Sequence, residues 1–257
     1  FKGMRGWDDG FVGNDPSSAI TTFGAFILCQ SSNLLDLLEL LFPFLCLLPF
    51  SFSLLTDKTT NTDVLFCAYE GKRRYVISKI IAVFVGSFII FMIPLCIEIL
   101  VNYIIFDNSM GANIFDPNWR FTGWGVGRVT DYPGAPFGDI LAMSPLLFSL
   151  LYAFFFSVMG GVFGVFGLAC SVFCRKNKAL AFAGGFVIFN ILQFLEDYSM
   201  NGDVEQKYTA LDPFRYTTFY YCSGYIGLDY ALFFGFLAAI LAISCIILFI
   251  SSKLEMI

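Results

Sequence analysis

Few side chains in this chain can do acid–base, nucleophilic or metal chemistry. The 257 residues contain no histidine, which excludes histidine zinc ligands, Ser-His and Cys-His catalysis and histidine proton relays. No G-x-x-x-x-G-K-[ST] sequence occurs, so we expect this chain to hydrolyse no ATP and to hold no cofactor or metal of its own. Ser157, Ser171 and Ser244 lie in apolar runs without a base, and a membrane enzyme is therefore the weakest of the hypotheses considered.

Glu98 is the only ionisable residue well inside the apolar run 80–106. An acid within a membrane span by default suggests an ion, proton or cargo path. Because Glu98 lies in the outer third of this run, its side chain can also simply reach the lipid headgroups. An ion-coupled carrier or channel that uses Glu98 is the alternative function. It lacks a second buried charge to partner Glu98 and an evident inverted repeat.

The eight cysteines do not form a pattern typical of a disulfide framework. Four of them fall inside apolar runs, where free cysteine behaves as a small hydrophobe: Cys46, Cys96, Cys170 and Cys245. Cys67 and Cys174 lie beside basic loops. Cys29 and Cys222 are the one pair that could meet on the opposite side, and we leave that pairing open.

The composition indicates a membrane protein. The chain is 58% hydrophobic and 14% charged, with a mean hydropathy of +0.76 and 33 phenylalanines, whereas soluble domains carry about 25% charged residues. We expect an all-α polytopic membrane protein with one transmembrane domain over 1–257. Its five visible spans are predicted at about 37–55, 80–106, 145–174, 179–195 and 230–251. Pro43, Pro49 and Pro94 predict kinks in the first two spans.

The distribution of basic residues predicts the orientation. Nine of the 15 Lys and Arg residues lie in 56–79, in 175–178 and at the C-terminus, so these segments are expected to be cytoplasmic. The outer loops are then 1–36, 107–144 and 196–229, and the visible chain runs N-out to C-in. A sixth span upstream of Phe1 would place both ends inside. The expected location is a cell membrane, of bacterial type, with several passes.

Two further sets of residues are candidates for packing or for a cargo path. Gly160 and Gly164 form a small-xxx-small pattern that lets helix backbones approach closely, either within one subunit or between two. Asn190 is a polar residue in the predicted fourth span. Pro213 and Gly224 bracket an aromatic stretch, and a re-entrant element is expected at about 211–228.

The segment 57–79 combines basic residues with a short apolar patch. Its basic residues are Lys58, Lys72, Arg73, Arg74 and Lys79. Val64, Leu65, Phe66 and Tyr69 can form the apolar face of a short helix that presses into a groove of a partner. The basic run can meet headgroups or an acidic partner surface. An ordinary basic anchor with the patch lying on the membrane is the competing interpretation.

This segment resembles the loop after the second span of type-2 ABC-transporter permeases. That loop commonly reads E-x-x-x-G-T-x-x-x-L-L-x-x-P-x-S-R-x-x-Y-L-x-x-K. Here Asp57 stands where Glu is usual, Asn61-Thr62 where Gly-Thr is usual, and Glu70-Gly71 where a Pro/Ser pair is common. The ending Arg74-Tyr75-x-x-x-Lys79 is kept. The layout of spans and loops matches over the whole visible chain, whereas the motif covers only this loop.

The resemblance implies the membrane subunit of an ATP-driven ABC exporter. It implies a homo- or heterodimer of permease subunits, docked through a coupling helix on cytoplasmic ABC ATPase subunits that hold ATP and Mg²⁺, with no nucleic acid. The expected coupling residues are Asp57, Asp63, Val64, Leu65, Phe66, Tyr69, Lys72, Arg73, Arg74 and Tyr75. Spans rich in Phe and Gly favour a hydrophobic or amphipathic cargo, as in antimicrobial peptide, drug or lipid efflux.

Overall fold

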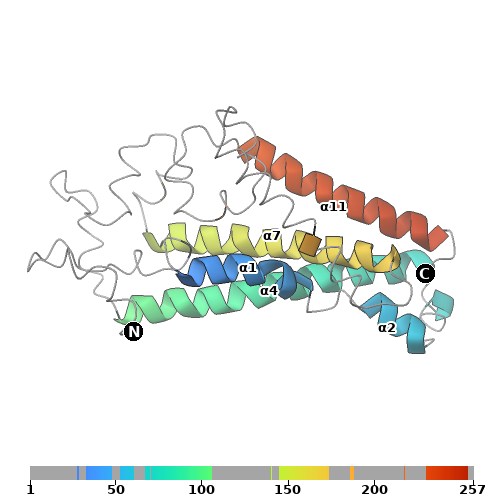
Figure 1. The fold of residues 1–257 in the computed structure, drawn as a ribbon, viewed down its shortest axis with the longest axis horizontal. Coiled ribbons are helices and arrows are strands. Elements are labelled where there is room, and N and C mark those ends of the chain that lie inside the picture. The colour runs from blue at the N-terminus through green and yellow to red at the C-terminus, as the bar shows by residue number, and fades with distance from the viewer. Residues whose placement is uncertain are drawn as a thin grey trace, which may run out of the picture.

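The computed structural model describes residues 28, 33–47, 53–60, 67–69, 71–105, 140, 145–173, 186–187, 217 and 230–253. Within these residues every position except Gly71 is helical and none is in a strand, as the composition predicts. The main helices are α1 (Asn33–Leu47), α2 (Ser53–Thr60), α4 (Lys72–Ile105), α7 (Pro145–Phe173) and α11 (Tyr230–Lys253). Figure 1 shows them as an elongated bundle.

Three helices are long and apolar enough to cross a membrane: α4, α7 and α11. They contain 34, 29 and 24 residues, or about 51, 44 and 36 Å at 1.5 Å per residue, against a hydrocarbon core of about 30 Å. α7 is the central helix, because 61% of its most apolar stretch is buried, compared with 22% in α4 and in α11.

α4 runs antiparallel to α7, and α11 runs in the same direction as α7 (Figure 1). Lys72 at the start of α4 therefore lies at the end of the bundle where α7 and α11 finish, and α2 lies at that end as well. We call it the basic end, and the opposite one the far end. This arrangement matches the predicted alternation of the spans, without fixing which end faces the cytoplasm.

Two described helices, α1 and α2, overlap the predicted first span, 37–55, and residues 48–52 between them lie outside the described residues. α1 has 15 residues, about 22 Å, and ends at Leu47, while α2 begins at Ser53. Pro43 lies inside α1, and Pro49 follows its end.

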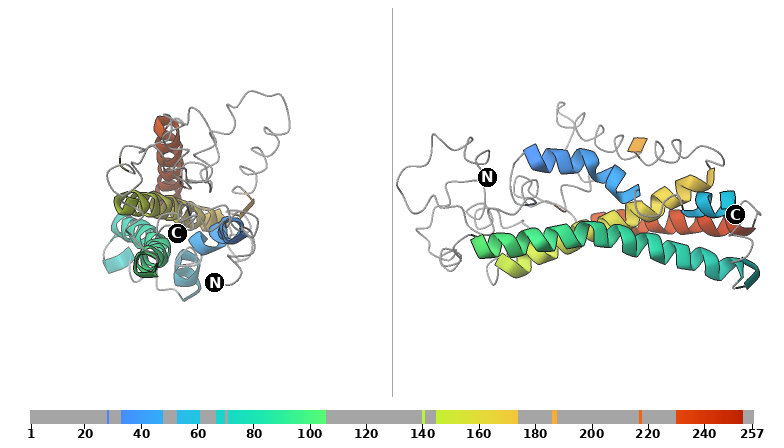
Figure 2. Two further views of the ribbon diagram at one scale, coloured as in Figure 1. Left: turned by 90° about the vertical axis from the view of Figure 1, so that its left-hand side faces the viewer. Right: turned by 90° about the horizontal axis from the view of Figure 1, so that it is seen from below.

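The other predicted spans agree to different degrees. The spans 145–174 and 230–251 correspond closely to α7 and α11. The helix that contains the predicted span 80–106 begins earlier than that span, because α4 is helical from Lys72. Pro94 lies inside α4, which Figure 2 shows as one continuous helix. The fourth span, 179–195, lies outside the described residues except for 186 and 187, as does the re-entrant element at 211–228 except for residue 217.

α4 and α7 pack through rows of residues four apart. Seven residues of α7 in this register are buried: Phe148, Tyr152, Phe156, Gly160, Gly164, Leu168 and Val172. The buried row of α4 is Val83, Ser87, Phe91, Leu95 and Ile99. Rows at this spacing on both helices are typical of ridge-into-groove packing with a right-handed crossing.

The glycines of α7 allow α4 to come close. A Cβ built on Gly160 would lie 2.6 Å from Cε2 of Phe91, and one on Gly161 would lie 2.8 Å from Cε2 of Phe84. The ring of Phe42 in α1 fills the adjoining space, with its centroid 5.0 Å from that of Phe91 and 5.2 Å from that of Phe156. α1, α4 and α7 thus share one aromatic core.

Candidate functional site

A polar cluster at the basic end joins α2 to α4. The hydroxyl of Tyr75 donates a hydrogen bond of 2.5 Å to Oδ2 of Asp57. Nζ of Lys79 lies 2.7 Å from the same oxygen and 5.6 Å from the centroid of the Tyr75 ring. Tyr75 and Lys79 are one turn apart on α4, whereas Asp57 comes from α2. One carboxylate oxygen therefore accepts from two donors on another helix.

The cluster is partly shielded from solvent. The side chains of Lys79 and Asp57 are 22% and 16% exposed, and Tyr75 is 3% exposed. A hydrogen bond to a charged group contributes about 1.5–3 kcal/mol, so this contact is a substantial tie between two helices. The Tyr75 ring packs in an apolar cluster from three helices, which comprises Val76, Val83, Val165, Leu168, Ala169, Val172 and Leu248.

A short helical turn, Cys67–Tyr69, precedes α4 and is closed by Gly71. The amide of Gly71 donates to the carbonyl of Cys67 over 3.1 Å, and Gly71 has a φ of 83°, the left-handed conformation common after a helix end. The carbonyl of Gly71 then accepts from the amide of Tyr75 over 3.2 Å. Gly71 thus ends one helix and begins the next.

Several predicted coupling residues are exposed around this turn. The Tyr69 side chain is 93% exposed, and Lys72, Arg73 and Arg74 are exposed as well. Other residues of the chain therefore leave nearly the whole aromatic ring of Tyr69 uncovered. A turn that carries an exposed ring, fixed by Gly71 beside a rigid helix, can serve as a contact point for a partner protein.

The structure brings together only part of the predicted site. Asp57 and Tyr75 are in contact, and Lys79, which the motif included without a role, completes the cluster. Asp63, Val64, Leu65, Phe66 and Asn190 lie outside the described residues.

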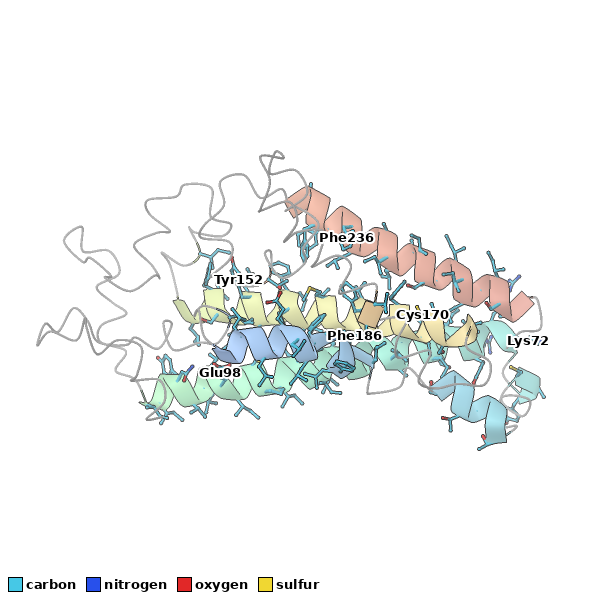
Figure 3. The ribbon with its side chains drawn as sticks, viewed as in Figure 1. Lys72, Glu98, Tyr152, Cys170, Phe186 and Phe236 are labelled. Carbon is cyan, nitrogen blue, oxygen red and sulfur yellow. The ribbon has the colours of Figure 1, made fainter. Side chains whose placement is uncertain are left out.

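The remaining candidates lie away from the basic end. Glu98 is partly buried on α4 toward the far end, whereas Lys72 marks the basic end (Figure 3). Gly160 and Gly164 pack inside the subunit against α4, which favours the packing role predicted for them.

One polar contact in the core was not predicted. The hydroxyl of Ser87 donates to the carbonyl of Cys46 over 3.0 Å, between α4 and α1. Cys46 is in the last turn of α1, where carbonyls have no partner within the helix. Ser87 lies opposite Gly164, and a serine facing a small residue in an apolar run is the signal that could have indicated this contact.

Within the described residues, no group of three His, Cys, Asp or Glu side chains could hold a metal ion. Three of the cysteines described there carry free thiols: Cys46, Cys96 and Cys245. The possible Cys29–Cys222 pair and Cys174 are outside the described residues.

Comparisons with protein families, with curated proteins and with solved structures found no match for this chain. The interpretation of the basic end therefore depends on its geometry and on the loop motif.

Proposed function

We propose that this chain is the membrane subunit of an ATP-driven ABC exporter. The observation that carries the proposal is the cluster of Asp57, Tyr75 and Lys79, which ties α2 to the foot of a helix long enough to cross a membrane. Next to it is the exposed turn Cys67–Tyr69. A permease that contains no ATP site needs a surface of this kind to receive movement from its ATPase.

In this proposal the ATPase contacts the turn at Tyr69, and Gly71 passes the movement directly into α4. Because Asp57 holds α2 against α4, both helices move as one body. α4 is in turn packed closely against α7 through Gly160 and Gly164. Closure of the ATPase would then tilt the α4–α7 pair and alternate the access of the cargo site between the two sides of the membrane.

The proposed partners are two cytoplasmic ABC ATPase subunits, which bind ATP and Mg²⁺, and a second permease subunit. The proposed cargo is a hydrophobic or amphipathic peptide, drug or lipid, and the proposed location is a bacterial cell membrane. The aromatic core supports a cargo of this class, because α1, α4 and α7 meet largely through Phe rings.

The test is to purify the tagged full chain from its own membranes in mild detergent. We expect an ABC ATPase to copurify, with ATP hydrolysis that vanadate inhibits. Tyr69→Asp should abolish both, because a charge would enter the proposed contact. Tyr69→Phe is the matched control and should keep both, since the ring is retained. Tyr69 is 93% exposed, so neither substitution should alter the fold.

Unchanged copurification and ATP hydrolysis in Tyr69→Asp, together with the same result for Leu65→Asp, would disprove docking through this segment. If transport does not depend on ATP and is lost in Glu98→Gln, the chain is an ion-coupled carrier and the proposal is wrong. The two results are distinct because Glu98 lies toward the far end of α4, whereas Tyr69 is three residues before Lys72, which begins α4 (Figure 3).

A further inference from the structure

α4 presents a row of exposed β-branched side chains that winds around the helix by about 40° at each step of four residues. The row contains a residue at every fourth position: Ile77, Ile81, Val85, Ile89, Ile93, Ile97, Val101 and Ile105. All eight are exposed, from 37% to 57%. In a helix that crosses a membrane, such a row is the surface that acyl chains cover.

Arg73 begins the same row, four residues before Ile77. At 3.6 residues per turn, Arg73 lies about 40° to one side of Ile77 and Arg74 about 60° to the other. Both side chains are exposed. The two guanidinium groups therefore flank the apolar row where it begins, at the basic end of α4.

The neighbouring lysines lie on another side of α4. Lys72 is about 140° and Lys79 about 160° from Ile77 around the helix, and Lys79 pairs with Asp57. Within the part of the chain that the structure describes, no ion pair involves Arg73 or Arg74. The basic residues of α4 thus have two roles: Lys79 pairs with Asp57 inside the bundle, whereas Arg73 and Arg74 are exposed at the start of the apolar row.

We propose that Arg73 and Arg74 bind the phosphate of an anionic phospholipid whose acyl chains lie along Ile77 and Ile81. A guanidinium group offers paired donors that fit a phosphate, and two of them also complement the extra negative charge of an anionic headgroup. Ile81 is eight residues from Arg73, about 12 Å along the helix, so the row starts within reach of the first acyl carbons.

Charge complementarity and continuity with the apolar row favour a lipid over a protein at these two positions. A protein partner that contacted Arg73 and Arg74 along this face would also have to cover Ile77 and Ile81. This inference does not depend on the proposed transport function, since it requires only that α4 crosses a membrane.

The test measures lipid retention by the purified full chain. Native mass spectrometry would record binding of dioleoylphosphatidylglycerol and of dioleoylphosphatidylcholine added to the protein in mild detergent. We expect the wild-type chain to prefer the anionic lipid. R73Q and R74Q should each weaken its binding about fivefold, and the double variant about 25-fold, with phosphatidylcholine binding unchanged.

K72Q is the matched control, because it removes the same charge from an exposed adjacent residue on another side of α4. It should leave anionic-lipid binding within about twofold of wild type. Equal weakening in K72Q and R73Q would overturn the proposal, since it would indicate a diffuse attraction.

Unchanged lipid retention in the double variant would also overturn it. If that variant kept the lipid but lost a copurifying protein, the arginines would belong to a protein contact instead. Helix content and melting temperature in phosphatidylcholine micelles, expected to equal those of wild type, check that the variants fold.

Discussion

Gly164→Ala adds a single methyl group at the tightest point of the bundle. The added Cβ would lie 2.9 Å from Cβ of Ser87, even closer to its hydroxyl oxygen, and 3.2 Å from the carbonyl oxygen of Cys46. The Ser87 hydroxyl and the Cys46 carbonyl form the hydrogen bond between α4 and α1. The methyl group therefore pushes on two helices and on the bond that joins them.

The expected cost can be worked out from these contacts. Overpacking in a well-packed core costs about 1–3 kcal/mol, and loss of the Ser87 bond costs about 0.5–1.5 kcal/mol. Alanine is favoured over glycine in a helix by up to about 1 kcal/mol, which offsets part of this cost. We expect the free energy of unfolding to fall by about 2 kcal/mol. Gly235→Ala is the control, because nothing lies within 4 Å of a Cβ at Gly235.

The assay is equilibrium unfolding of the purified protein from mild detergent by titration with sodium dodecyl sulfate. Gly235→Ala should leave the free energy of unfolding unchanged or slightly higher. The effect of Gly164→Ala should shrink in a Ser87→Gly background, where the clash is removed. The reasoning about close helix approach is refuted if Gly164→Ala and Gly235→Ala agree within about 0.5 kcal/mol.

Two further substitutions test the cluster at the basic end and the acid in α4. Tyr75→Phe keeps the buried ring but removes the donor to Asp57; the same unfolding assay should show a loss of about 1–2 kcal/mol, and no loss in an Asp57→Ala background, which lacks the acceptor, would be the expected cycle result. An equal loss in both backgrounds would contradict the contact. Glu98→Gln should leave ATP-dependent transport in proteoliposomes within about twofold of wild type, and a complete loss would make Glu98 part of the transport path.

The boundaries of α7 and α11 could be predicted from the sequence because hydrophobicity and helix ends coincide there. Pro145 suits the first turn of a helix and precedes an unbroken apolar run. Tyr230 begins a run that continues to Ser251 without a charged residue. In both places the chain changes from polar to apolar within one or two residues, so the membrane limits and the helix limits are nearly the same.

The start of α4 could not be predicted in this way. A hydrophobic run reports where lipid begins, and α4 extends beyond it through the charged residues Lys72–Arg74 to Gly71. Hydropathy carries no information about this extension.

In the candidate site, too, the sequence predicted individual residues but not the contacts between them. The motif singled out Asp57 and Tyr75 separately, but their contact joins residues 18 positions apart through the return of the chain from α2 to α4. Lys79 was visible as the last residue of the motif. Its charge pairs with Asp57, instead of meeting a partner or the membrane, because of the side of α4 on which Lys79 lies. The packing of Tyr75 determines which side that is.

The contrast between the glycines indicates which joint of the bundle would move under a force applied at the basic end. Phe91 and Ser87 are fitted against the backbone of α7 at Gly160 and Gly164, so α4 cannot slide along α7 without steric clash. At Gly235 the backbone of α11 approaches nothing closely, and the rings of Phe155 and Phe234 lie between α7 and α11 with centroids 5.5 Å apart. The Phe155 and Phe234 side chains can change rotamer, whereas the Phe91 ring and the Ser87 side chain are held against the α7 backbone at Gly160 and Gly164. A movement that enters through the Cys67–Tyr69 turn would therefore carry α4 and α7 together and change their angle to α11.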